Sequence, residues 1–157
     1  MVRSFLAMVL LLLIQNVAVA QESVFEADDK LAKLTRLWAE EFIAFASNRY
    51  NEELDWSQVS IKYLDEMVDD LHETYKTENP PDEDITPVAR AIGSYVGEVY
   101  RIFYGGSWGW LALEDGTFPA IQSENGAHFL PFVKMLQLIK THEDPDVWEY
   151  FQLLTAQ

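Results

Sequence analysis

Residues 86–106 place the strongest constraint on what this chain can fold into. The segment opens with Thr-Pro, and proline suits the first helical position, while its closing Gly-Gly is typical of a helix end. At about 100° per residue, one face of this helix is apolar, and Gly93 and Gly97 lie one turn apart on a different side. Interior glycines cost a helix roughly 1 kcal/mol each, so this pair indicates close packing. We expect a central helix that is contacted on two sides.

Two amphipathic helices are predicted before the central one. Residues 26–47 carry apolar side chains at steps of three and four, after Ser23 and Asp28 as candidate N-caps. Residues 58–76 show the same spacing and carry carboxylates on the opposite arc. These carboxylates belong to Asp65, Glu66, Asp69, Asp70 and Glu73. The polar, proline-rich and acidic segment 77–84 is predicted to be a loop.

Extended segments replace the helical pattern after residue 106. Residues 107–113, 118–122 and 127–130 predict a small antiparallel meander, and Pro119 favours an edge position for its strand. A helix over residues 131–140 follows. A short final helix is predicted after Asp144 and Pro145, with Val147, Trp148, Phe151 and Leu154 as its apolar residues. The predicted fold class is α+β: N-terminal helices, a central Gly-containing helix, a small antiparallel β-meander, then two C-terminal helices.

The first 20 residues have the three-part layout of a bacterial secretory signal peptide. A positive start with Arg3 precedes an apolar run over residues 5–14 and an Ala-x-Ala end at Ala20. A membrane span needs roughly 20 apolar residues, so this run is too short for one. We expect cleavage after Ala20, export to the periplasm or the medium, and no stable membrane insertion afterwards. Residues 21–157 are then expected to form a single acidic domain.

Charge and cysteine content narrow the possible functions. The chain has no cysteine, so its domain needs a well-packed core and has neither a disulfide nor a thiolate nucleophile. Without residues 1–20, 10 Lys and Arg face 26 Asp and Glu, a net charge of −16. Such a charge disfavours nucleic acid and anionic lipid, which need clustered Lys and Arg, and it favours basic partners or divalent cations.

Several short motifs follow one another within residues 85–154. The segment 92–98 (IGSYVGE) is followed by Gly-Gly-Ser-Trp at 105–108, two short strands, a proline-opened helix and a short aromatic helix. This order resembles a family of bacterial domains of unknown function, the family numbered 3806, whose members run from a Gly-x-x-x-Gly-acid helix through a Trp strand to a proline-started helix. The resemblance implies a fold and no chemistry. The acidic segment before Thr86 and the lack of a basic cluster near Lys134 depart from the family.

Glu98 is the carboxylate whose position in the sequence most suggests a specific structural or functional role. It lies in a helix of apolar and small residues, beside Ser94 and Arg101. An ion pair with Arg101 at i,i+3 is the structural interpretation, and ligand binding or catalysis is the alternative. A lone carboxylate provides no acid/base pair, so no catalytic residue and no enzymatic activity are predicted.

The spacing of residues does not support a metal site, a cofactor site or a catalytic serine. His72, His128 and His142 are not four residues apart, and the acidic runs lack the alternating ligands and central glycine of a calcium loop. Gly-Gly-Ser-Trp-Gly at 105–109 matches a nucleophile elbow in letters, but it runs from helix to strand where the elbow runs from strand to helix. We predict no metal and no cofactor.

Two functions from different classes remain. The first is a non-enzymatic interaction domain of the cell envelope, which binds a basic protein through its acidic helix face and the 77–84 segment; an immunity-like or inhibitor-like protein is one version. The alternative is a module that binds glycans or small ligands on a surface formed by Trp108 and Trp110, which share one face of their strand. The same tryptophans would serve equally as core residues.

Overall fold

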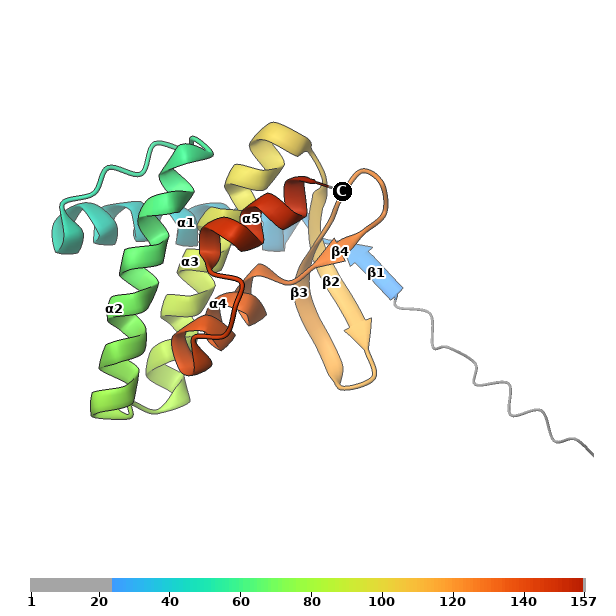
Figure 1. The fold of residues 1–157 in the computed structure, drawn as a ribbon. Helices are drawn as coiled ribbons and strands as arrows, with labels where there is room; N and C mark the ends of the chain where they lie inside the picture. Colours follow the sequence, from blue (N-terminus) through green and yellow to red (C-terminus); the bar gives the residue numbers. More distant parts are fainter. Residues whose placement is uncertain (1–23, 157) are drawn as a thin grey trace, which may run out of the picture.

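The computed structural model describes residues 24–156, so the predicted signal peptide at 1–20 lies outside the described residues. Within these residues, five α-helices and a four-stranded antiparallel sheet make an α+β fold, as predicted (Figure 1). The helices are α1 (Asp29–Tyr50), α2 (Tyr63–Glu78), α3 (Asp82–Tyr104), α4 (Pro131–Thr141) and α5 (Val147–Thr155), and a 3-10 turn, η1 (Val59–Lys62), precedes α2. The strands are β1 (Val24–Ala27), β2 (Ser107–Leu113), β3 (Gly116–Gln122) and β4 (His128–Phe129).

The central helix α3 packs on several sides, which confirms the prediction from its glycines. Every residue from Ile92 to Tyr100 is buried. A Cβ at Gly93 would meet the backbone of Pro131 at 2.8 Å, and a Cβ at Gly97 would overlap the Trp108 ring. The two glycines therefore let α4 and β2 approach the helix axis more closely than any side chain would allow.

Helix α3 begins four residues before the predicted Thr-Pro start, so the prediction of a loop over 77–84 is wrong. Helix α2 runs to Glu78, Pro81 is the extended N-cap of α3, and three carboxylates fill the first turn of α3. Acidic side chains are favourable there because they face the positive end of the helix dipole. Pro87 lies inside the helix near its start, where its ring removes one backbone hydrogen bond.

Strand β1 was not predicted, because residues 24–27 were assigned to a helix start. The strand pairs with β2, with Phe25 opposite Leu111 and Ala27 opposite Gly109. Four residues are too few to show periodicity, and their partner lies more than 80 positions away in the chain. The alternative cap Asp28 is confirmed, since its carboxylate accepts the backbone N–H groups of Lys30 and Leu31 at 2.7 and 3.2 Å.

The sheet order is β1-β2-β3-β4, so the prediction that Pro119 marks an edge strand is wrong for β3 as a whole. Strand β4 is only two residues long and pairs with Ile121 and Gln122. Pro119 lies beyond the reach of β4 and pairs on its other side with Trp110. Proline is tolerated because no strand requires an N–H donor on its open side.

The helices lie to one side of the sheet (Figure 1). Trp108, Ile121 and Phe129 project from the sheet into the main core, together with the buried residues of the helices. No helix within residues 24–156 is long and apolar enough to cross a membrane.

Candidate functional site

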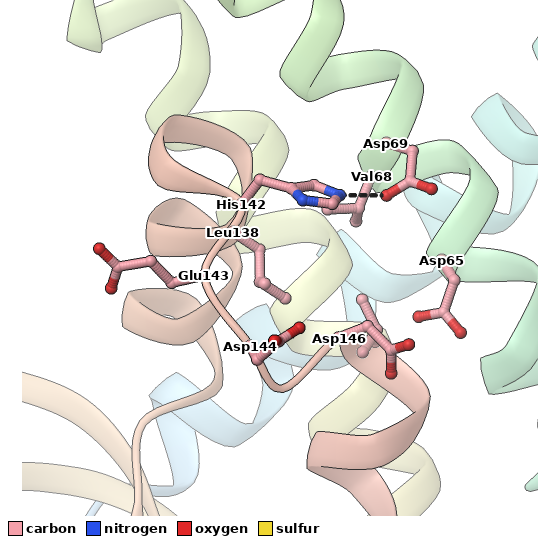
Figure 2. Close-up of a pocket in the computed structure, with 9 residues that line it drawn as sticks. Asp65, Val68, Asp69, Leu138, His142, Glu143, Asp144 and Asp146 are labelled. Atoms are coloured by element: carbon pink, nitrogen blue, oxygen red, sulfur yellow. Dashed lines mark hydrogen bonds and ion pairs between the residues drawn. The ribbon is translucent and has the colours of Figure 1, made fainter.

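A small carboxylate-rich pocket lies where α2 meets the α4–α5 connection and the start of α5 (Figure 2). Its volume is about 20 Å³. Apolar side chains from three elements contribute to it, namely Val68, Leu138 and Val147. The polar lining consists of Asp65, Asp69, His142, Glu143, Asp144 and Asp146. We call these nine residues the acidic pocket.

Asp65 and Asp146 together cap the N-terminus of α5. The Asp65 Oδ1 accepts the Trp148 backbone N–H at 3.0 Å, and the Asp146 Oδ1 accepts the Glu149 N–H at 2.7 Å. The first N–H groups of a helix have no partner within the helix, so both carboxylates satisfy donors that would otherwise be free. Asp65 therefore fixes α5 against α2 as well as contributing charge to the acidic pocket.

His142 forms the wall of the pocket that faces α2. Its Nε2 lies 2.7 Å from the Asp69 Oδ1, a contact that becomes an ion pair when the ring is protonated (Figure 2). His142 is the left-handed C-cap of α4, and its ring lies 4.9 Å, centroid to centroid, from the ring of His72. The imidazole is thus held in place by its backbone position, by Asp69 and by His72.

The carboxylate side chains that line the pocket point in different directions. The carboxylates of Asp65 and Asp146 lie near one another, Asp144 lies on the other side of the connecting loop, and Glu143 points away from the pocket (Figure 2). Glu143 instead accepts the Gln137 side-chain amide at 2.9 Å. Burial raises the pKa of Asp65 above its ordinary value, and the charges of Asp146 and Asp69 act in the same direction. The pocket therefore contains a carboxylate that is penalised for carrying its charge.

We expect Asp65→Asn to make the free energy of unfolding less dependent on pH. Because the folded pKa of Asp65 is raised, the folded chain holds a proton that the unfolded chain has lost, so stability falls as pH rises from the ordinary value of 3.8 through the raised pKa. The asparagine oxygen still accepts the Trp148 N–H without this penalty. At pH 7 the urea midpoint of the variant is expected to be equal to that of the wild type or a few tenths molar higher.

Urea unfolding between pH 3 and pH 7 checks this expectation, with the exposed Glu66→Gln as the matched control. The control should run parallel to the wild type at every pH. A loss of stability in Asp65→Asn that grows as the pH rises toward 7 would show that charge capping of α5 outweighs burial.

The structure places the predicted acidic residues of α2 along one side of the molecule, in differing surroundings. Glu66 is exposed, Asp70 accepts the Tyr50 hydroxyl at 2.8 Å, and Glu73 pairs with Lys76 at 3.0 Å. Burial first, and then the hydrogen bond to Asp70, raises the pKa of Tyr50 to about 12. Asp65 and Asp69 alone of the five line the acidic pocket.

Sequence reasoning missed the contribution of the α4–α5 connection. Asp144 and Asp146 lie 79 and 81 positions from Asp65, and only the packing of α5 on α2 brings them together. A run of four acids within residues 143–149 was a visible indication of charge. It did not show which helix the charge would face.

Glu98 is buried, at 4% exposed, beneath a groove between α1 and α3. Its Oε1 accepts the Trp108 indole N–H at 2.7 Å and pairs with the Arg101 Nη1 at 2.9 Å, which confirms the predicted i,i+3 pair. The Arg36 Nη1 lies 4.0 Å from its Oε2. These contacts join α1, α3 and β2, so the carboxylate holds the fold together at this point.

The predicted surface of Trp108 and Trp110 is not present as a pair. Trp108 is 2% exposed, with its ring against Gly97, so it has no face free for stacking. Trp110 is 38% exposed and donates its indole N–H to Asp28 at 2.9 Å. The two side chains share a face of β2, but α3 covers only the part that holds Trp108. The interpretation of Trp108 as a core residue is the one that the structure supports.

The histidines remain apart from any metal-type cluster. His72 bonds the Ile139 carbonyl oxygen through Nδ1 at 2.9 Å, and His128 contacts the Gln122 side chain at 2.9 Å. Among residues 24–156, no three His, Asp or Glu side chains are arranged to hold a metal ion. What the acidic pocket offers chemically is a negative, partly apolar recess.

Comparisons with known proteins return no relative. No protein-family model, no curated protein and no solved structure matches the chain. The resemblance of residues 85–154 to the family numbered 3806 therefore stays a prediction.

Proposed function

We propose that this chain is an exported protein, periplasmic or secreted, that binds a basic protein partner through its acidic surface and does not catalyse a reaction. The observation that carries the proposal is the acidic pocket. Its lining brings together five carboxylates and an imidazole over apolar side chains, with no Lys or Arg among the nine residues. Glu66 and Asp70 extend the negative surface along α2, whereas Glu73 is paired with Lys76.

The size of the pocket favours a lysine side chain. A volume of about 20 Å³ holds one water-sized group, which is the size of an ammonium and smaller than a planar guanidinium. Val68, Leu138 and Val147 offer apolar contact to the methylene stem of the lysine. Asp144 and Asp146 offer acceptors to the ammonium.

The charge of the whole chain supports the same partner. With a formal net charge of −15, the protein attracts a basic partner from a distance and repels acidic ones. An immunity-like or inhibitor-like protein that neutralises a basic effector is one form of this function. Export rests on the layout of residues 1–20.

A salt-dependent capture tests the proposal. The bait is the protein recovered from the producing cell, and N-terminal sequencing checks that it begins at Gln21. We expect a basic envelope or secreted protein to be retained at low salt and released at high salt, because screening weakens contacts between exposed charges. The double variant Glu66→Lys/Asp144→Lys is expected to raise the Kd of the captured protein roughly tenfold or more.

The matched control is Glu114→Lys/Asp115→Lys, which makes the same change of charge in the exposed β2–β3 turn. Its effect on Kd should stay within about twofold, since only the overall field changes. Equal loss in both variants would mean that net charge and not this face determines binding. Retention of no salt-sensitive basic protein, or a bait that begins at Met1 inside the cell, would contradict the proposal.

A further inference from the structure

Two recesses flank Val88 in the N-terminal half of α3, and they share no lining residue with the acidic pocket. The first lies between α1 and α3, has a volume of about 210 Å³, and is lined by Phe42, Phe45, Pro87, Val88 and Ala91 with Glu41. The second lies between α2, α3 and α4, has a volume of about 120 Å³, and includes Leu71, Tyr75, Ile85, Val88 and Ile139 with Asp84. Val88 lines both, so it forms the ridge between two adjacent recesses.

The chemistry of these recesses is apolar with acidic margins. Phe45 is 41% exposed, although its ring stacks on Phe42 at 6.3 Å between centroids. Among residues 24–156, the charged residues that line the two recesses are Glu41 and Asp84, and both are acids. The nearby Lys140 is paired with Asp82 at 2.5 Å and so adds no free positive charge.

We propose that the two recesses bind a basic amphipathic segment of another protein, with one apolar side chain in each recess and Lys or Arg facing Glu41 and Asp84. Charge complementarity selects this occupant. A second copy of this chain would bring its own acids against the same acidic margins, and an anionic lipid surface would be repelled by the net charge of −15. The site goes beyond the proposed function, because it uses different residues and an apolar contact.

Two apolar recesses side by side suit a segment with anchors on one face. Adjacent apolar recesses recognise apolar side chains at helical spacing, while the flanking charges set the orientation of the bound segment. Filling the recesses also covers Phe45, whose exposure leaves apolar area in water. We therefore expect binding to require both the apolar side chains of the segment and its positive charge.

A labelled synthetic peptide of Leu and Lys with amphipathic helical spacing tests the proposal by fluorescence anisotropy with the full protein. A second peptide with Ser in place of Leu keeps the charge and lacks the anchors. The Leu peptide is expected to bind at least roughly tenfold more tightly. Val88→Lys should remove most of this difference, because it puts a polar, charged side chain where the apolar side chains of the Leu peptide would bind. Ala91→Leu, which fills the first recess without charge, should weaken binding several-fold.

Phe103→Lys is the matched control, since it changes a half-exposed apolar residue on the same helix far from the recesses. It should leave the Kd within about twofold, as should Glu66→Lys/Asp144→Lys, which separates this site from the acidic pocket. Circular dichroism checks that each variant is folded. Equal binding of the Ser and Leu peptides would overturn the proposal. Equal losses of binding from Val88→Lys and Phe103→Lys would also overturn it, and so would an unchanged Kd in both Val88→Lys and Ala91→Leu.

Discussion

Replacing Trp108 by alanine is expected to lower the free energy of unfolding by about 4 kcal/mol, within the range for truncating a buried aromatic residue. The side chain is 2% exposed, and its ring fills the space beside Gly97 and Ile121. Its ring also packs on Phe132 at 5.4 Å between centroids. The loss therefore leaves a cavity between the sheet, α3 and α4, where three elements meet.

Chemical denaturation of the variant and the wild type measures this effect. Trp110→Ala is the matched control: the residue lies two positions along the same strand, is 38% exposed, and should cost less than about 1.5 kcal/mol. Trp108→Phe retains an aromatic ring and removes the N–H donor, so its cost should fall between the two. Equal costs for both alanine variants would refute the assignment of Trp108 to the core.

The second large effect is expected at Glu98. Changing Glu98 to alanine should cost about 3 kcal/mol, because the buried indole N–H of Trp108 loses its acceptor at 2.7 Å and Arg101 loses its partner at 2.9 Å. The loss is smaller than for a fully buried ion pair, since the Arg101 side chain is 30% exposed and water can solvate it.

Glu98→Gln tests whether the acceptor oxygen or the charge carries this contribution. The amide keeps an oxygen for the indole N–H, so its cost should be about 1 to 2 kcal/mol. Glu40→Ala is the control for the ion-pair network, because Glu40 pairs with Arg36 on the exposed surface and should matter little. In a double-mutant cycle, Trp108→Phe and Glu98→Ala should be non-additive, since they share one hydrogen bond. Strict additivity would show that the bond contributes nothing to stability.

These two residues explain why the most conspicuous carboxylate of the sequence has a structural role. Glu98 faces the junction of α1, α3 and β2, and its Oε1 is engaged by Trp108 and Arg101. Gly97 precedes it because the Trp108 ring lies directly on the helix at that turn. Glycine, carboxylate and indole thus form one packing unit.

The sequence alone was sufficient for the features that depend on local periodicity. The α+β class, the central helix ending at Gly105, the proline-started α4 and the short α5 all follow from apolar spacing and from Pro and Gly positions. The Glu98–Arg101 pair was also predictable, because residues three apart on a helix are neighbours whatever the rest of the fold does. The close approach at Gly93 and Gly97 followed from the same local geometry.

Features that depend on contacts distant in sequence required the tertiary structure. Strand β1 exists only because β2 provides its hydrogen bonds, and the first turn of α3 forms through residues that resemble a loop. Spacing placed Trp108 and Trp110 on one face, but burial of one and exposure of the other depend on where α3 lies. The acidic pocket joins α2 to the α4–α5 connection across almost 80 positions. Periodicity specifies which face of an element is apolar, whereas the packing of elements against one another decides what that face, and the charges beside it, will meet.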